Sequence, residues 1–493
     1  LLAENRAEWL LADMGTLTAG AVTVPLHAPL SARQVHYQLA DAGACWLFVS
    51  TAAQLDKVRQ VRAELPDLRG VVIFDRDAAG DDARSWAGFL QHGRQVLPRY
   101  EAELARREAE LGPDSLATIM YTSGTTGNPK GVMLTHGNLL SNAMGMLEAM
   151  PPGPDDVVLC WLPLSHIYAR TVDHYARLAA GAVLCLAESA ETVVRDLDAV
   201  TPTHLSSVPR FYEKVLTAVA ADDPAKTSRR LREVFGPRIR FLNSGGAPLP
   251  PPIGAAYRAA GLPLFEGYGL TESSPVISFN RPGHCKPGTV GQALPGVEVA
   301  IAADGEVLTR GPHVMRGYWN NPEATAEALR DGWLHTGDLG TLDADGYLTI
   351  TGRKKELLVL SNGKKVVPAH VEGLLLADPC IDQAVVYGEG RNYLTALVVP
   401  HWDNLRRALR DGGAGLDGPT PEALAEHPGV RACLEERVAA ALTEVAPWER
   451  VRKVVVLAQP LTVAADELTV SLKLRRQVIV ARYGERLEAL YRE

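Results

Sequence analysis

The feature that most constrains the fold of this chain is an alternation of short apolar runs with segments of helical spacing. Apolar residues recur at helical intervals over Glu8–Ala21 and Ala32–Ala42, and Gly20 is a suitable stop for the first of these helices. Short apolar runs of strand length lie between and after them, at Val22–Pro25, Trp46–Val49, Val71–Phe74, Leu116–Tyr121, Val157–Leu162 and Val183–Leu186. This alternation predicts a layered α/β architecture with largely parallel sheets.

The second half of the chain has a different texture. From about Gly288 the apolar runs shorten, and Asp304-Gly305 and Asp345-Gly346 are strong hairpin signals, which predicts a small β-rich subdomain. The run that ends at Asp345-Gly346 also resembles part of a calcium loop, but the other ligand positions are absent, so we favour the hairpin. After residue 355 an α/β pattern returns, with an expected helix at Pro368–Ala377 and expected strands at Ile381–Tyr387 and Leu394–Val399.

Three polar segments carry no clear pattern. We expect a surface excursion at Asp75–Gly112, a polar connection at Asp222–Arg232 and a loop at Asp411–Pro421.

Composition excludes several classes of protein. A chain of 493 residues with a net charge of −8 has no basic footprint, so we do not expect a nucleic-acid partner. No apolar run approaches the ~18 residues that a membrane-spanning helix needs, although peripheral membrane contact is left open. Six cysteines without a CxxC pair indicate reduced thiols in a cytoplasmic protein. The chain opens Leu-Leu-Ala-Glu-Asn, so we also expect an upstream segment.

The glycine- and hydroxyl-rich run from Tyr121 to Gly131 is the strongest candidate for a binding site. It follows the apolar run that ends at Met120, and it contains Lys130. Backbone N–H groups and hydroxyls in such a loop can surround an anion, and a nucleotide triphosphate is the best candidate. The run is not a Walker loop, because Pro129 precedes the lysine and a glycine follows it.

Other polar groups follow apolar runs later in the chain. Five segments each place polar or glycine residues after such a run. They are Trp161–His166, Asn243–Pro248, Tyr268–Glu272, His335–Asp338 and Gly352–Arg353. A basic stretch, Asp466–Arg476, lies near the C-terminus. Each of these segments taken singly is compatible with an ordinary turn, strand end or solvated face.

Taken together and in this order, the segments resemble the adenylate-forming enzymes, a superfamily that includes acyl-CoA synthetases, luciferases and peptide-synthetase adenylation domains. The resemblance covers nearly the whole chain. It implies a large N-terminal domain, residues 1–354, made of two doubly wound α/β subdomains and a small β-barrel-like subdomain. It also implies a small, mobile α+β C-terminal domain, residues 355–493, that turns about Lys355.

The resemblance also implies roles for individual residues. Lys473, His166, Thr271 and Glu272 correspond to catalytic positions, and Thr126 and Glu272 to the positions that hold Mg²⁺. The residues implied to bind the nucleotide are Thr122, Ser123, Gly124, Thr125, Thr126, Gly127, Lys130, Gly245, Gly246, Ala247, Tyr268, Gly269, Asp338 and Arg353. The chemistry agrees with these roles, because fixed donors and cations must offset the repulsion between a carboxylate and a polyphosphate.

The implied reaction joins a carboxylate to AMP and then passes the acyl group to a thiol, with ATP, Mg²⁺ and coenzyme A as cosubstrates. Val208–Lys214 and Leu468–Lys473 resemble long-chain acyl-CoA synthetases, so a medium- or long-chain fatty acid is the expected substrate. Three positions depart from that pattern: Ala169, Val470 and Ser471. An acyl-AMP ligase that loads a carrier protein, and a non-catalytic nucleotide- or acyl-binding homologue, remain open alternatives. The resemblance does not predict the oligomeric state.

Overall fold

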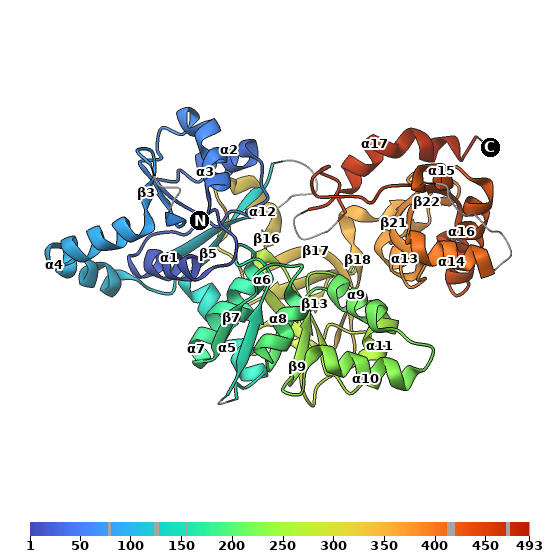
Figure 1. Ribbon diagram of the computed structural model, residues 1–493, viewed down its shortest axis with the longest axis horizontal. Coiled ribbons are helices and arrows are strands. Elements are labelled where there is room, and N and C mark those ends of the chain that lie inside the picture. The colour runs from blue at the N-terminus through green and yellow to red at the C-terminus, as the bar shows by residue number, and fades with distance from the viewer. Residues whose placement is uncertain (77–79, 123–127, 154, 412–419, 470–473, 493) are drawn as a thin grey trace.

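The computed structural model describes residues 1–76, 80–122, 128–153, 155–411, 420–469 and 474–492. Figure 1 shows a large N-terminal part, coloured blue to yellow, beside a smaller orange-to-red C-terminal part. The α/β class predicted from the sequence is confirmed. No helix within the described ranges is long and apolar enough to cross a bilayer.

A seven-stranded sheet forms the centre of the N-terminal part. Its order is β12-β11-β10-β9-β8-β6-β7. The five strands β6 to β10 run parallel, and β11 and β12 are antiparallel to their neighbours. The strands are β6 (Val157–Cys160), β7 (Val183–Leu186), β8 (His204–Ser207), β9 (Phe241–Ser244), β10 (Leu264–Gly269), β11 (Val276–Phe279) and β12 (Gln292–Ala293). The helices that follow β7 to β9 are α8 (Val193–Val200), α9 (Pro209–Val219), α10 (Pro224–Phe235) and α11 (Pro251–Ala259). Their apolar faces pack on the sheet in one core cluster.

Two smaller sheets near the N-terminus are joined by single bridges. The first is parallel, β1-β2-β3, and the second is antiparallel, β4-β5-β15. Leu2 forms single bridges to Val49 and to Leu26, and Thr23 forms one to Thr118. The predicted strand Val22–Pro25 therefore contributes only the bridge at Thr23. The strands are β1 (Trp46–Val49), β2 (Gly70–Ile73), β3 (Arg84–Ser85), β4 (Leu116–Thr122), β5 (Lys130–Thr135) and β15 (Gly317–Tyr318). The helices are α1 (Ala7–Thr18), α2 (Ala32–Asp41), α3 (Ala52–Val61), α4 (Trp86–Glu110) and α5 (His136–Ala149).

Two polar segments are helices. The predicted excursion at 75–112 does lie on the surface, but most of it is α4, a 25-residue helix without a buried residue that projects from the body (Figure 1). The predicted polar connection at 222–232 is wrong, because α10 spans it. Asp223 caps that helix by accepting a hydrogen bond from the Ala225 N–H, and Leu231 and Phe235 are buried. The charged outer face of α10 conceals this narrow apolar stripe in the sequence.

The β-rich segment is a five-stranded sheet beside the cavity described below. It consists of β13 (Glu298–Ile301), β14 (Glu306–Arg310), β16 (Leu329–Arg330), β17 (Trp333–Leu342) and β18 (Leu348–Arg353), with α12 (Pro322–Ala328) alongside. Both predicted hairpins are confirmed, and Gly305 and Gly346 have the positive φ that such turns require. The Asp343 carboxylate accepts the N–H groups of Asp345 and Tyr347, so its role is to close the turn.

The C-terminal part has its own core. A three-stranded sheet, β21-β22-β23, is packed between two apolar clusters. Its strands are β21 (Ile381–Tyr387), β22 (Leu394–Pro400) and β23 (Val451–Val456), preceded by the hairpin of β19 (Leu358–Val359) and β20 (Lys365–Val366). The helices are α13 (Pro368–Leu375), α14 (Trp402–Asp411), α15 (Pro421–Ala425), α16 (Pro428–Ala441) and α17 (Arg476–Ala489). Most of the predicted loop at 411–421 lies outside the described residues.

Candidate active site

A cavity of about 1460 Å³ lies where strands from three sheets end. The carboxyl ends of β9 and β10 meet the β4–β5 hairpin and β17 there, and the C-terminal part closes one side. Ligands of open α/β sheets bind at such strand ends. The sequence-predicted residues that line the cavity are Thr122, Lys130, His166, Gly245, Gly246, Tyr268, Gly269, Thr271, Glu272, Arg353 and Lys355. Ser123, Gly124, Thr125, Thr126, Gly127 and Lys473 lie outside the described residues.

A buried carboxylate, which is not itself among the lining residues, lies behind one end of the cavity. Asp338, only 3% exposed, accepts a hydrogen bond from the Tyr268 hydroxyl (2.7 Å) and pairs with Arg353, whose Nε lies 2.7 Å from Oδ1. Asp338 and Arg353 are cross-strand partners in the β17–β18 ladder, which sets their separation. Burial, together with the negative charge of Asp338, raises the pKa of Tyr268 well above its usual value, so the phenol remains a donor. A carboxylate such as that of Asp338 can accept hydrogen bonds from two neighbouring hydroxyl groups of a ligand, beside the aromatic ring of Tyr268.

A second buried carboxylate, Glu306 on β14, braces this end of the cavity. It accepts the N–H of Gly337 (2.9 Å), and it lies 3.2 Å from His335 Nδ1 and 3.1 Å from Lys354 Nζ. Although burial alone would raise the pKa of Glu306, hydrogen bonds from His335 and Lys354 outweigh it and lower that pKa. Sequence reasoning missed Glu306, because a glutamate after an Asp-Gly turn carries no local signal of burial.

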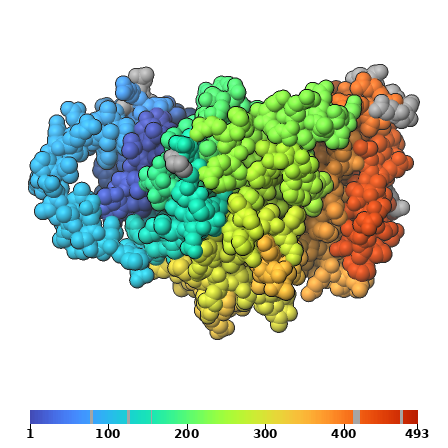
Figure 2. All heavy atoms as spheres, turned by 90° about the horizontal axis from the view of Figure 1, so that it is seen from below, coloured from blue at the N-terminus to red at the C-terminus, as the bar shows by residue number. Residues whose placement is uncertain are grey.

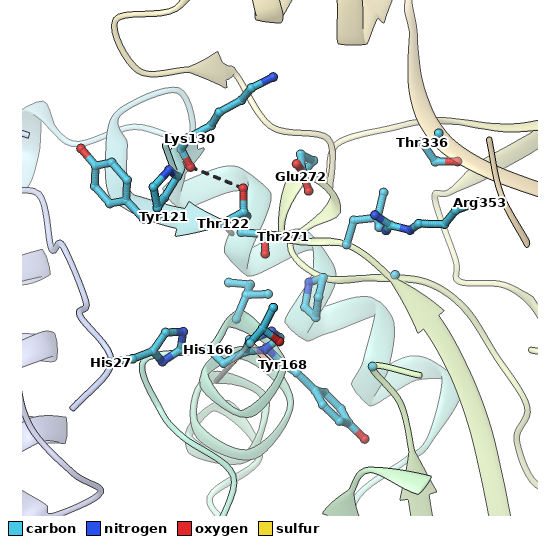
Figure 3. A pocket seen from close by; sticks show the side chains of 18 of the residues that line it. His27, Tyr121, Thr122, Lys130, His166, Tyr168, Thr271, Glu272, Thr336 and Arg353 are labelled. Atoms are coloured by element: carbon cyan, nitrogen blue, oxygen red, sulfur yellow. Dashed lines mark hydrogen bonds between the residues drawn. The ribbon is translucent and has the colours of Figure 1, made fainter. Parts of the chain in front are cut away.

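The opposite end of the cavity carries the candidate phosphate groups. Lys130 Nζ lies 5.0 Å from the centroid of the Tyr318 ring, and the Tyr318 hydroxyl donates to Glu272 Oε1 at 2.8 Å. Figure 3 shows Thr122, Lys130, Thr271 and Glu272 grouped together, with Arg353 farther along the pocket. Tyr318, which the sequence analysis did not identify, therefore links the lysine of one motif to the glutamate of another.

The donor set fits a magnesium ion that is held mainly by phosphate oxygens. In the described part of the chain, no three His, Cys, Asp or Glu side chains gather to hold a metal ion by themselves. Glu272 supplies one carboxylate to the cavity beside Lys130. Mg²⁺ commonly takes one or two carboxylates together with substrate phosphates and water, so Glu272 is a suitable ligand.

The glycine-rich turn after β9 reaches the cavity only in part. Gly245 and Gly246 line it, whereas the predicted Ala247 is not among the lining residues. A Cβ on Gly245 would lie 3.3 Å from the Tyr168 ring, and Gly246 has a φ of +83°. Both glycines therefore serve a close approach or a turn that other residues would strain.

Gly269 is required by the close approach of two strands. A Cβ there would lie 1.8 Å from the carbonyl oxygen of Pro275. We expect Gly269→Ala to shift the turn that carries Thr271 and Glu272 and to destabilise the fold by about 3 kcal/mol. Denaturant unfolding measures this loss. The control Gly15→Ala, in α1 with nothing within 4 Å, should be neutral or slightly stabilising; equal stability of both variants and wild type would contradict the expectation.

Two histidines lie together beside the apolar side of the cavity. His166 precedes the short helix α6 (Ile167–Ala169), and its Nδ1 accepts the Tyr168 N–H at 3.2 Å. The ring of His27 stacks on it with centroids 6.3 Å apart, and His27 Nδ1 lies 2.7 Å from Ser165 Oγ (Figure 3). Burial lowers the pKa of His27 to about 4, so this histidine is neutral at pH 7. His27 was not predicted, because no pattern in the sequence marks it.

The buried His27 predicts a pH dependence of stability. Its pKa is lower in the folded chain than in the unfolded chain, so the unfolded state binds more protons between about pH 6.5 and 4, and stability falls as the pH falls through that window. In His27→Gln this loss should be smaller by about 3 kcal/mol. Denaturant unfolding at several pH values tests this, and other buried histidines cancel in the comparison. Parallel stability curves for the two proteins would contradict it.

The remaining wall of the cavity is largely apolar. It is formed by Met146, Tyr168, Val172, Val276 and Phe279. Val208–Phe211, the start of the run that resembles long-chain acyl-CoA synthetases, is not among the lining residues, because Val208 and Phe211 pack into other core clusters.

Ala169, which departs from the long-chain pattern, is part of the core. Ala169 is fully buried, and its neighbour Arg170 pairs with Asp13 of α1 and donates to Thr118. The ion pair of Arg170 is therefore made within the body of the protein, without a carboxylate at position 169.

The C-terminal part supplies one side of the cavity. Lys355 lies in a short 3-10 helix, Lys354–Glu356, directly after β18, and it lines the cavity while its side chain is 66% exposed. Val463, Asp466, Leu468, Leu474 and Arg475 also line it, so the stretch on either side of position 473 borders the cavity.

The comparisons with known proteins agree with this geometry. The family model described as AMP-binding enzyme matches residues 1–319, and that of the AMP-binding enzyme C-terminal domain matches residues 355–493. This chain belongs to the AMP-binding enzymes. It is 35% identical to Long-chain-fatty-acid--CoA ligase FadD15 of Mycobacterium bovis, with 100% of this chain and 87% of the relative covered. It is 28% identical to Long-chain-fatty-acid--CoA ligase 6 of Mus musculus, covering 100% and 78%.

Solved structures of AMP-binding enzymes share the fold. ATP-bound MatB from Rhodopseudomonas palustris is 27% identical, with a TM-score of 0.73 over 98% of this chain and 88% of that chain. The anthranilate CoA ligase AuaEII in complex with anthranoyl-AMP is 21% identical, with a TM-score of 0.76 over 99% and 87%. These likenesses establish a large N-terminal and a small C-terminal domain as the architecture.

Proposed function

We propose that this AMP-binding enzyme activates a medium- or long-chain fatty acid with ATP and transfers the acyl group to coenzyme A. The observation that supports it most is the make-up of the large cavity. Arg353, Lys130 and Glu272 line it, and Asp338 lies behind Arg353 as its ion-pair partner. These groups suit a magnesium nucleotide, and they adjoin an apolar wall at His166. Relatives named as long-chain-fatty-acid–CoA ligases support the choice of acid and thiol.

In the first step a carboxylate oxygen of the fatty acid bonds to the α-phosphorus of ATP, and the bond from that phosphorus to pyrophosphate breaks. Asp338 and Arg353 hold the ribose beside Tyr268, and Lys130 offsets the charge of the departing pyrophosphate. Glu272 and Thr126 would hold Mg²⁺, which lowers the charge on the phosphate oxygens. Lys473, as a compact cation, bridges the carboxylate and the α-phosphate.

In the second step the sulfur of coenzyme A bonds to the acyl carbon, the carbon–oxygen bond to AMP breaks, and the thiol proton leaves. We propose that the C-terminal domain, residues 355–493, turns about Lys355 between the steps, which removes Lys473 and admits the thiol. His166 borders the place where the carboxylate and thiol meet. The six free cysteines fit a reducing cytoplasmic location.

Pyrophosphate exchange into ATP across a series of carboxylic acids tests the proposal. We expect exchange to depend on added acid and to be strongest with medium- or long-chain fatty acids. Preformed acyl-AMP should then yield more thioester with coenzyme A than with a holo-carrier protein. Absence of exchange with every acid in the series would indicate a non-catalytic binding protein, and a preference for the carrier would indicate an acyl-AMP ligase.

A further inference from the structure

An ion pair outside the lining of the cavity joins the two parts of the protein. Arg210, in the first turn of α9, pairs with Glu213 one turn later (2.8 Å) and with Asp382 of β21. The side chains of Arg210 and Asp382 are 30% and 28% exposed, so water screens the pair only partly. Figure 2 shows the green region that contains α9 in contact with the orange C-terminal part. Neither Arg210 nor Asp382 lines the cavity.

The backbone directs Asp382 out of its sheet. Ile381 pairs with Pro400 and Gln383 with Val399, so β21 carries one extra residue there, and Asp382 is at that bulge. A bulge leaves a residue outside the regular ladder and changes the direction of its side chain. The residue that meets Arg210 is therefore the one that the bulge leaves outside the regular ladder.

The residue after Asp382 holds the segment that closes the cavity. Gln383 Oε1 accepts the Leu461 N–H (2.7 Å), and Gln383 Nε2 donates to the Leu461 carbonyl (3.2 Å). Leu461 is followed at once by the cavity-lining stretch that begins at Val463.

The same stretch is fixed to the rest of the C-terminal part. Glu467, only 2% exposed, accepts hydrogen bonds from the Thr462 N–H (3.1 Å), from Arg482 (2.7 Å) and from the Tyr483 hydroxyl (2.8 Å) of α17. The stretch and β21 thus belong to one body, and the position of β21 against α9 decides where the stretch lies over the cavity.

We propose that Arg210 and Asp382 are positioning residues for acid activation: their ion pair holds the C-terminal domain where the stretch at Val463–Thr469 closes the cavity. The inference rests on the proposed function. The ion pair stabilises the arrangement of the two parts seen here relative to any arrangement in which the C-terminal domain has turned. Loss of the ion pair therefore slows formation of acyl-AMP. It does not slow thioester formation, which is the step for which the domain must turn.

Charge reversal tests the pair. We expect Arg210→Glu and Asp382→Arg each to lower fatty-acid-dependent pyrophosphate exchange about tenfold, a typical size for coupling between two arrangements. Thioester formation from supplied acyl-AMP should stay at the wild-type rate, which also shows that the variants fold. The double variant restores an ion pair with opposite polarity, so its exchange should return to within about threefold of wild type.

The distance between the two parts, measured by electron paramagnetic resonance with one spin label on α10 and one on α16, is a second readout that does not depend on activity. The distribution of distances should broaden in each single variant and return to the wild-type width in the double variant. Arg310→Glu is the matched control, because it breaks an ion pair with Glu298 (2.6 Å) within the β13–β14 hairpin. This control should leave pyrophosphate exchange, thioester formation and the distribution of distances unchanged.

Two results would overturn the inference. One is wild-type behaviour of both single variants; the other is equal slowing of both half-reactions without recovery in the double variant. If the wild-type protein exchanged no pyrophosphate with any carboxylic acid, the proposed function would be refuted instead. The distance between the two spin labels would then still decide whether the ion pair holds the domain.

Discussion

Asp338→Ala should lower kcat/KM for ATP by about 100- to 1000-fold. Asp338 is buried between Tyr268 and Arg353, and it is the acceptor for both. Its removal takes away the carboxylate that we propose accepts hydrogen bonds from the ribose hydroxyls, and truncation of one charged partner in a desolvated contact costs about 2–5 kcal/mol of binding. Since each 1.4 kcal/mol is about tenfold in affinity, weaker nucleotide binding alone accounts for the expected effect.

Binding and folding can be separated in this variant. AMP should raise the melting temperature of the wild-type protein, because a ligand that binds the folded state stabilises it, and this rise should vanish in Asp338→Ala. Asp345→Ala provides the control, since that aspartate is exposed in the turn after β17. If Asp338→Ala kept its response to AMP and its kcat/KM for ATP, the carboxylate would not bind the nucleotide.

Lys473→Ala should lower acyl-AMP formation by about 100- to 1000-fold, the size of effect that loss of one transition-state charge contact produces. The stretches on both sides of this position, including Asp466 and Arg475, border the cavity. We expect thioester formation from supplied acyl-AMP to remain near the wild-type rate, because the lysine is proposed to leave before that step. Separate assays of the two half-reactions measure the difference.

An exposed lysine serves as the comparison for Lys473. Lys226 lies on the outer face of α10, and Lys226→Ala should leave both half-reactions unchanged. Equal loss of both half-reactions in Lys473→Ala would show that the lysine acts in both steps or supports the fold, and it would refute the proposed domain turn about Lys355.

Local patterns were sufficient for the class of fold and for most elements. The strand at Val183–Leu186 and the helix at Ala32–Ala42 follow from apolar spacing, and the turns at Gly305 and Gly346 follow from Asp-Gly pairs. The helix at Pro224–Phe235 was missed, because most of its surface faces water and only two of its residues are buried. Apolar periodicity reveals a helix or strand only when enough of its residues are buried for apolar side chains to recur at regular intervals.

The residues of the candidate site also fall into those that the sequence identified and those that it did not. The order of the motifs, and the resemblance to a known family that this order carries, identified Lys130, Glu272, Asp338 and Arg353. Tyr318 and Glu306 carry no such signal. Each joins the site through a hydrogen bond to a residue from another sheet or strand, and only the packed structure shows that bond.

By itself the sequence determined most of the segments that form helices and strands, and many of the polar groups that lie at their ends, since both depend mainly on neighbours along the chain. Tertiary structure alone decided that Tyr268 meets Asp338, that Lys130 lies by Tyr318, and that Asp382 meets Arg210. These partners are brought together by strand register, sheet packing and a bulge. Contacts between distant segments depend on how whole elements pack, and no local pattern records that packing.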